Sequence, residues 1–365
     1  MTTYLDYIPI YDGDRYCLMC RHVCPVGRVT KREVTTPHGW ALLIASVIRG
    51  SLAWDADSVD ALYQCSDCST CQTNCVTDRP LPAAIKAARA EVVRQGVMPA
   101  SVAEVDRKLR EWGNPYGPLP HPVSSQGSGP VGVFIGDATR FLRPASVTAA
   151  QTVVTAVTGQ SPALLSVGRS SGYLPYALGL WDTARSLIQQ TLDEVKAAGV
   201  REIITLSAED ADTFRRAYAE LGLGLPAEVR VTPLMQYLAP RLAEGQVKLR
   251  PNGLPVATYH DPCLAMTLPG YGAAARQVVA ALTGRAPREM FWREKRAGPC
   301  GAIGGLEFTQ PALSAEMARQ RIAEASETGA EILLTDDPHC AAQLDSFAQG
   351  FCVQSVIELL AEHIQ

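Results

Sequence analysis

The segment QCSDCSTCQTNC at residues 64–75 spaces four cysteines as Cys-x2-Cys-x2-Cys-x3-Cys. Such spacing bends a short loop around a cubane iron–sulfur cluster, so that the first three thiolates reach one cluster and the fourth points away. An earlier segment, YCLMCRHVCPVG at residues 16–27, fits the same template from Cys17 onward, with Asp14 in the first position. Two such runs in one chain normally exchange their fourth cysteines. The pair therefore predicts two 4Fe-4S clusters shared between the runs.

The exchange assigns the ligands of each predicted cluster. The first cluster would be held by Asp14, Cys17, Cys20 and Cys75, and the second by Cys24, Cys65, Cys68 and Cys71. Proline after the first run supports this exchange, because it cannot continue the preceding turn and redirects the chain. A carboxylate is a harder ligand than a thiolate, so the first cluster is expected to lose iron more easily. The alternative is a pair of structural zinc sites, although zinc needs only four ligands per site and does not explain two matched runs.

Composition describes an ordinary globular chain of 365 residues, with 47% hydrophobic and 19% charged residues. A net charge of -4 leaves no basic field for a phosphate backbone, so nucleic acid is not an expected partner. The N-terminus has no apolar leader, and the longest apolar run, residues 40–48, is too short to span a bilayer. We expect a cytoplasmic protein, at most peripheral to the inner face of the membrane through a partner. Eleven cysteines in that compartment predict metal binding rather than disulfides.

The order of predicted elements indicates an α + α/β fold. Residues 1–112 carry helical signals, and the Pro- and Gly-rich residues 113–130 are predicted to be a linker. Strands and helices then alternate in two units, residues 131–248 and 249–365, which suggests a duplication. The expected strands are residues 131–136, 201–206, 254–260 and 331–335, and the expected long helices are residues 182–198 and 311–328.

Both cysteine runs resemble the dicluster ferredoxin domain in the iron–sulfur subunits of glycolate oxidase, anaerobic glycerol-3-phosphate dehydrogenase and heterodisulfide reductase. That resemblance implies an all-helical dicluster domain followed by two cysteine-rich half-domains. Each half-domain of the family has a lone cysteine, a Cys-Cys-Gly and a Cys-Pro-x-Cys. The corresponding C-terminal residues are Cys263, Pro299-Cys300-Gly301 and Asp337-Pro338-His339-Cys340. The earlier half has lost its cysteines, and its corresponding residues are Asp137, Ser170-Ser171-Gly172 and residues 207–210.

A third site is possible in the C-terminal half. Its candidate ligands are Cys263, Cys300, Cys340, Asp337 and His339, a set compatible with zinc or with a three-thiolate iron–sulfur cluster. The three sulfurs are expected to converge, because each follows a strand end, where crevices of open α/β sheets form. The alternative is three buried thiols inherited from an ancestor. Cys352, in an apolar stretch, is expected in the core, and the oxygen-rich first half is expected to be scaffold.

By resemblance, the chain would relay electrons from an FAD-dependent dehydrogenase subunit of the glycolate or lactate type to a quinone or soluble carrier. The sequence shows no general base, nucleophile or flavin motif, so we expect the non-catalytic iron–sulfur subunit of an oxidoreductase complex. A heterodisulfide-reductase-like enzyme subunit is one alternative, and it conflicts with the missing cysteines. The other alternative is a zinc-stabilised interaction module without redox function.

Overall fold

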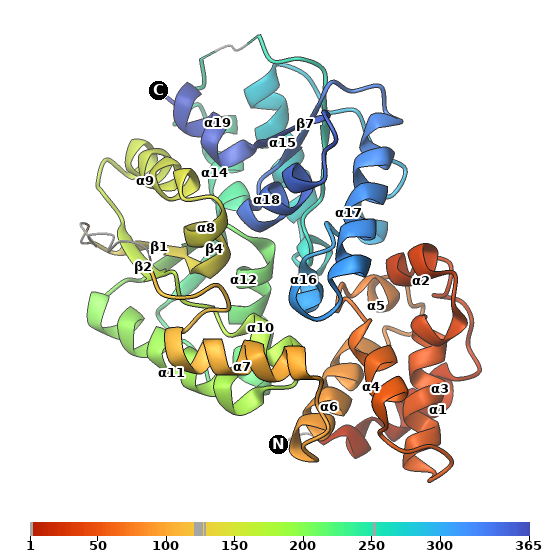
Figure 1. Cartoon of the computed structure of the whole chain (residues 1–365). Coiled ribbons are helices and arrows are strands. Elements are labelled where there is room, and N and C mark those ends of the chain that lie inside the picture. Colours follow the sequence, from red (N-terminus) through yellow and green to blue (C-terminus); the bar gives the residue numbers. More distant parts are fainter. Residues whose placement is uncertain (1–2, 120–126, 128, 251–252) are drawn as a thin grey trace.

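The computed structural model describes residues 3–119, 127, 129–250 and 253–365. It combines helices with two parallel β-sheets, in agreement with the predicted mixture of helical and α/β structure. Figure 1 shows the helices of residues 3–94 gathered on one side of the molecule and the two sheets with their helices on the other. The helix of residues 100–112 lies across the first sheet's unit, beside the helix of residues 181–198.

The regular elements of the described residues up to 112 are all helical. They are η1 (Tyr4–Tyr7), α1 (Ile8–Asp14), α2 (Pro25–Thr30), η2 (Glu33–Thr35), α3 (Pro37–Ile48), α4 (Ala56–Tyr63), α5 (Thr70–Thr73), α6 (Leu81–Arg94) and α7 (Ala100–Trp112). The apolar stretch of the sequence is α3, whose Trp40 and Ile44 are buried in the N-terminal core. No helix in the part of the chain that the structure describes is long and apolar enough to cross a membrane.

The predicted linker begins with a packed segment, residues 113–119. Asn114 is fully buried, and its side-chain oxygen accepts hydrogen bonds from the backbone N–H of Tyr116 and Gly117 at 2.9 Å each. The Tyr116 ring stacks on Phe141 at 5.3 Å and meets Phe308 edge-on at 5.7 Å. These contacts anchor the start of the segment between the two α/β units, whereas residues 120–126 and 128 lie outside the described residues.

The first α/β unit is built on a parallel sheet of strand order β2-β1-β3-β4. Its strands are β1 (Val131–Ile135), β2 (Ala163–Val167), β3 (Glu202–Thr205) and β4 (Arg230–Pro233). Its helices are α8 (Gly136–Leu142), α9 (Ala145–Thr158), α10 (Tyr173–Ala177), α11 (Trp181–Ala198), α12 (Ala208–Asp212), the π-helical turn η3 (Thr213–Ala217), α13 (Tyr218–Glu220) and α14 (Leu234–Ala243).

The second unit has a smaller parallel sheet of order β5-β6-β7. Its strands are β5 (Ala257–Tyr259), β6 (Ile332–Thr335) and β7 (Cys352–Ser355). Its helices are η4 (Ala265–Thr267), α15 (Tyr271–Thr283), η5 (Glu294–Arg296), η6 (Ile303–Gly305), α16 (Leu306–Thr309), α17 (Pro311–Ser326), α18 (Pro338–Ser346) and α19 (Val356–His363). The expected strands and long helices in both units are present, with ends that differ by a few residues.

Strand register makes the two units comparable residue by residue. Phe134 of β1 lies opposite Thr205 of β3, while Tyr259 of β5 lies opposite Leu334 of β6. If β3 is aligned with β6 so that Thr205 corresponds to Thr335, the register aligns Phe134 of β1 with His260, the residue after β5. Asp137 then corresponds to Cys263. The loops after β3 and β6 also correspond in this alignment. Ser207 and Asp337 occupy equivalent positions, and the side chain of each accepts a hydrogen bond from the backbone N–H three residues later.

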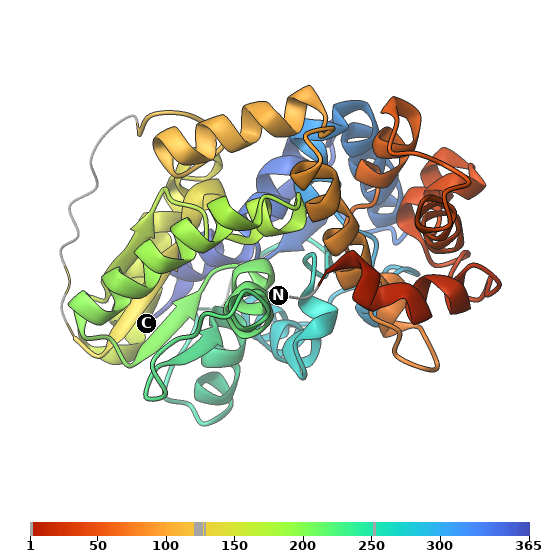
Figure 2. The ribbon, with the colours of Figure 1, turned by 90° about the horizontal axis from the view of Figure 1, so that it is seen from below.

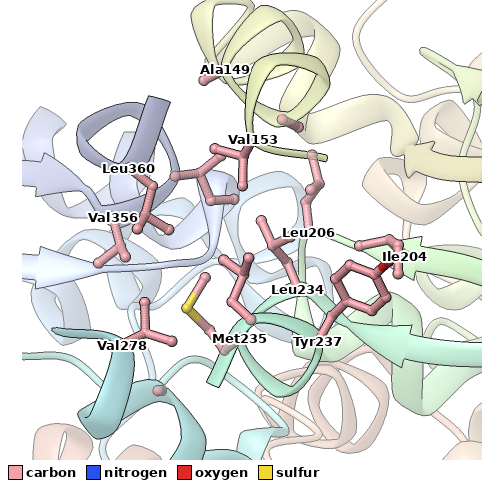
Figure 3. Close-up of a cluster of buried hydrophobic side chains, with 14 of the residues drawn as sticks. Ala149, Val153, Ile204, Leu206, Leu234, Met235, Tyr237, Val278, Val356 and Leu360 are labelled. Atoms are coloured by element: carbon pink, nitrogen blue, oxygen red, sulfur yellow. The ribbon is translucent and has the colours of Figure 1, made fainter. Parts of the chain in front are cut away.

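The two units bury a shared hydrophobic core between reciprocal pairs of helices. α9 of the first unit packs on α19 of the second, and α15 of the second packs on α14 of the first. Figure 3 shows Val153 of α9, Leu360 of α19 and Met235 of α14 in this one cluster. The view in Figure 2 shows the N-terminal helices flanking the assembled units. Because the core belongs to both units, their loops at the strand ends are held in a fixed relation.

Substituting Leu360→Ala tests this shared core. Leu360 is 1% exposed, so its truncation removes apolar contacts and leaves a cavity that should lower the free energy of unfolding by about 2–5 kcal/mol. Denaturant titration followed by circular dichroism measures the change. Leu52→Ala is the matched control, since Leu52 is 50% exposed, and its effect should stay within about 0.5 kcal/mol. Equal losses in the two variants would contradict the assignment of the core.

Candidate metal centres

The second cysteine run, residues 65–75, forms a tight loop between α4 and α6. Asp67 and Ser69 have left-handed backbone, with φ of 53° and 60°. Such conformations are uncommon for residues other than glycine and persist only where the surroundings hold them. Here the Asp67 carboxylate is fixed by Lys86 at 2.7 Å and by the hydroxyl of Tyr173 at 3.2 Å. The loop thereby turns Cys65 and Cys68 into the interior, where both are buried.

Cations from α6 lie under this loop. Lys86 and Arg89 are both buried, and Arg89 donates hydrogen bonds to the carbonyl oxygens of Leu62 and Cys65 at 3.0 and 2.6 Å. Burial raises the pKa of the Cys65 thiol to about 12, and the charge of Arg89 acts against that rise. α6 therefore supplies positive potential at the first cysteine of the run.

The first cysteine run leads from the end of α1 to the start of α2. Cys24 caps α2, because its Sγ accepts a hydrogen bond from the N–H of Gly27 at 3.4 Å, and Pro25 occupies the first helical position. Cys17 is exposed. Asp14, at the end of α1, lies 3.4 Å from Arg79. Burial raises the pKa of Asp14, and Arg79 opposes the rise.

The two runs interact electrostatically in a crossed pattern. Burial raises the pKa of Cys24, and the negative charges that raise it further are those of Cys68 and Cys65. For Cys20, burial raises the pKa to about 12, with further contributions from three neighbours, Asp14, Cys17 and Cys75. The charges that act on Cys24 are thus those of second-run thiols, and Cys75 is among the charges that act on Cys20. Thiols of both runs, Cys68 and Cys65 as well as Cys20 and Cys24, raise the pKa of Cys71 after burial.

In the C-terminal half, three thiols converge. Cys263 Sγ lies 3.7 Å from Cys300 Sγ and 3.9 Å from Cys340 Sγ, and the three residues are buried. They come from loops after β5, before η6 and at the start of α18, so only the fold brings them together. The separations suit soft thiolate ligation of iron or zinc.

His260 lies beside these thiols, and its Nδ1 accepts a hydrogen bond from Arg321 Nε at 2.9 Å. Arginine Nε always carries hydrogen, so Nδ1 is unprotonated and the hydrogen of the neutral ring is on Nε2. Burial, followed by the charge of Arg321, lowers the pKa of His260 to about 3, which keeps the ring neutral. Its Nε2 is buried without a hydrogen-bond partner among the described residues. One ring nitrogen of His260 lies within 4.8 Å of the sulfurs of Cys263 and Cys340.

This orientation differs from that of most metal-binding histidines, which donate their other N–H to a carbonyl or carboxylate. Here that second nitrogen, Nδ1, faces the cationic Arg321 as an acceptor. The arrangement therefore leaves Nε2 as a protonated donor and does not favour a bond from Nε2 to a metal.

The other two predicted ligands of the third site have different partners. Asp337 caps α18 by accepting a hydrogen bond from the N–H of Cys340 at 3.0 Å. His339 Nε2 lies 3.3 Å from Glu307. Burial alone would lower the pKa of His339, but Glu307 raises it above its usual value. Within the described residues, the group of ligand atoms close enough to share a metal includes His260 rather than Asp337 or His339. His260 precedes Cys263 by three positions, but its neighbour Arg321 could not be identified from sequence.

The corresponding loops of the first unit hold oxygen atoms instead of sulfur. Burial, then the charge of Asp210, raises the pKa of Asp137 to about 6. The Ser207 hydroxyl donates a hydrogen bond to the Asp210 carboxylate at 2.7 Å, so each of these two side chains has a partner within the loop. No group of three histidine, cysteine or carboxylate ligand atoms gathers there in the parts of this unit that the structure describes. The loops retain their shape without metal ligands.

The loop GPCGAIGG at residues 298–305 connects the C-terminal thiols with the second run. Gly304 has a left-handed backbone with φ of 74°, and a Cβ placed on it would lie 2.7 Å from the carbonyl oxygen of Ser66. Glycine is therefore required for close backbone approach here. Gly301 has φ of 101°, and its counterpart in the first unit, Gly172, has φ of 99°. This agreement shows that the glycine of the motif serves the fold in both units.

Known proteins with similar sequences include subunits of reductases. A family model described as "Cysteine-rich domain" (CCG) matches residues 257–345. One subunit of the dihydromethanophenazine:CoB–CoM heterodisulfide reductase of Methanosarcina barkeri is 26% identical over 331 residues, covering 83% of this chain and 78% of its own. One subunit of the fumarate reductase (CoM/CoB) of Methanothermobacter marburgensis is 24% identical, with 82% of this chain and 61% of its own covered.

A probable membrane-anchored ferredoxin of Chromohalobacter salexigens is 24% identical over 92% of this chain, which spans 52% of that protein. Among solved structures, glutamate racemase RacE1 of Bacillus anthracis shares 10% identity and a TM-score of 0.34, covering 65% of this chain and 80% of its own. That structural likeness is too weak to carry an argument. Residues 257–345 therefore match the cysteine-rich (CCG) domain, and most of the chain is similar to proteins that are named as subunits of reductases.

Proposed function

We propose that this protein is an electron-transfer subunit that carries two 4Fe-4S clusters in residues 1–112. The observation that carries the proposal is the crossed arrangement of the two cysteine runs. Cys24 shares its electrostatic surroundings with Cys65 and Cys68, while Cys20 shares its own with Cys75 and Asp14. Paired zinc sites require no such exchange, whereas two-cluster ferredoxin runs do.

The first cluster would be held by Asp14, Cys17, Cys20 and Cys75, and the second by Cys24, Cys65, Cys68 and Cys71. Both clusters supply one-electron chemistry, and the protein supplies positioning and electrostatics. Asp14 already has Arg79 as a partner, so binding iron would exchange that ion pair for a bond to metal.

A route into the C-terminal half supports a relay. Cys68 belongs to the same buried cluster as Cys263, Cys300 and Cys340. Met266, in η4 just after Cys263, also touches the second run, since the hydroxyl of Thr73 lies 3.3 Å from its sulfur. We propose that the three C-terminal thiols hold a further iron–sulfur group, with His260 as a hydrogen-bond donor to sulfur rather than as a ligand.

The partners follow from the same reasoning. Two relatives are named as subunits of reductases, which supports assembly with other subunits. We propose an FAD-dependent dehydrogenase of the glycolate or lactate type as electron donor, and a quinone or soluble carrier as acceptor. The relative named as a membrane-anchored ferredoxin supports a position at the inner face of a membrane, reached through a partner.

The exchange of fourth cysteines predicts the effect of Cys24→Ala. The variant should lose the second-run cluster and keep the first, because the charges of Cys68 and Cys65 act on Cys24. Iron analysis and EPR of the anaerobically purified, reduced protein would show one of two signals missing. Cys352→Ala is the control, since Cys352 is exposed, and it should retain both signals. Loss of the first-run cluster alone in Cys24→Ala would refute the assignment.

Asp14→Cys should make the first-run cluster more resistant to oxidation, because thiolate binds iron more tightly than the harder carboxylate does. Mild oxidation followed by EPR would measure how much three-iron form appears. Asp12→Cys, on the same helix and in an ion pair with Arg49, is the control and should behave as the parent protein does. Equal three-iron yields in Asp14→Cys and the parent protein would exclude Asp14 from the site.

Cys340→Ser tests the C-terminal group. If that group holds iron, the variant should contain less iron and acid-labile sulfide per chain than Cys352→Ser, and zinc should be absent from both. Elemental and sulfide analysis of anaerobic preparations gives the answer. Zinc that disappears in Cys340→Ser would identify a zinc site, and equal contents in the two variants would leave only three buried thiols.

A further inference from the structure

Arg89 and Arg321 are the largest fully buried side chains among the described residues, and Arg89 is 0% exposed. Arg89 lies at the middle of α6, directly under the second run. Its Nη2 donates to the carbonyl oxygens of Leu62 and Cys65, and its Nη1 donates to that of Ala177 at 2.9 Å. A buried cation is costly to desolvate, by several kcal/mol, unless a negative charge compensates it.

Among the residues that the structure describes, no acidic side chain pairs with Arg89. Across the described ranges of the chain, no carboxylate oxygen lies within 4.0 Å of a guanidinium nitrogen of Arg89. Asp67, the acid in the same loop, is occupied by Lys86 and by the Tyr173 hydroxyl. The Tyr63 ring, with its centroid 4.9 Å from the guanidinium carbon, and three carbonyl dipoles stabilise the cation only in part. Arg321 differs, because Glu324 pairs with it at 2.9 Å.

We propose that Arg89 is the counter-ion of the 4Fe-4S cluster held by the second run, an inference that rests on the proposed function. A cubane bound by four thiolates is anionic, and it becomes more so when it accepts one electron. Arg89 therefore stabilises the reduced cluster more than the oxidised cluster and raises its reduction potential. Lys86 adds little net charge, because its ion pair with Asp67 is neutral overall.

A purely structural role is the competing explanation, since Arg89 ties α4, the second run and α10 together through three carbonyls. The two roles can be distinguished because only the counter-ion role depends on the positive charge of residue 89. Arg89→Lys keeps the positive charge but loses the guanidinium fork, whereas Arg89→Gln keeps a hydrogen-bond donor and loses the charge. Arg94→Gln removes a cation from the same helix at a side chain that is 71% exposed, and it serves as the control.

The experiment is an EPR-monitored redox titration of the anaerobically purified full chain, with dithionite as reductant. In Arg89→Gln, one cluster should show about a tenfold lower ratio of reduced to oxidised form at a fixed potential, equivalent to ~59 mV for a one-electron couple. The other cluster, Arg89→Lys and Arg94→Gln should remain near the parent values. Loss of one cluster from a folded Arg89→Gln variant that Arg89→Lys retains would equally support the counter-ion role.

Unchanged potentials in Arg89→Gln would overturn the proposal, as would equal loss of the cluster in both Arg89 variants. These outcomes differ from failure of the proposed function, in which the parent protein itself would contain no iron–sulfur signal. Circular dichroism of each variant confirms that the chain is folded before its titration is interpreted.

Discussion

The buried ion pair between Asp67 and Lys86 is the interaction on which the arrangement of cysteines depends. It fixes the left-handed turn at Asp67 and so determines where Cys65 and Cys68 point. The same carboxylate accepts the hydroxyl of Tyr173 from the first α/β unit. The second unit reaches the neighbouring residue, because Gly304 packs against the carbonyl of Ser66. One short loop is therefore the meeting point of all three parts of the chain.

Much of the fold and part of the candidate site could be predicted from local sequence. Alternating strand and helix patterns predicted the parallel α/β units. The positions of Cys263, Cys300 and Cys340 in loops between these elements predicted that the three sulfurs converge. Cys352 was expected in the core and is exposed. It is the first residue of β7, an edge strand whose side chains alternate between the two faces, so apolar neighbours do not determine its burial.

Other features depend on contacts between segments far apart in sequence. His260 meets Arg321 across 61 positions, and Arg89 meets Ala177 across 88. Periodicity and motif spacing contain no information about such pairs. The same lack of information affects the ligands predicted at Asp337 and His339. In sequence, an aspartate that caps a helix and a histidine in an ion pair cannot be distinguished from metal ligands at the same spacing.

Comparison of the two α/β units separates what the fold needs from what metal binding needs. Both units keep the glycine at a left-handed position and the side-chain cap of the following helix, at Gly172 and Ser207 in one and at Gly301 and Asp337 in the other. Cysteine is present at these loops only in the second unit, although both units contact the second run, the first through Tyr173 and the second through Gly304. The first unit forms these loops without cysteine, so folding does not require the thiols of Cys263, Cys300 and Cys340. Their convergence in the second unit is therefore consistent with the metal binding proposed above.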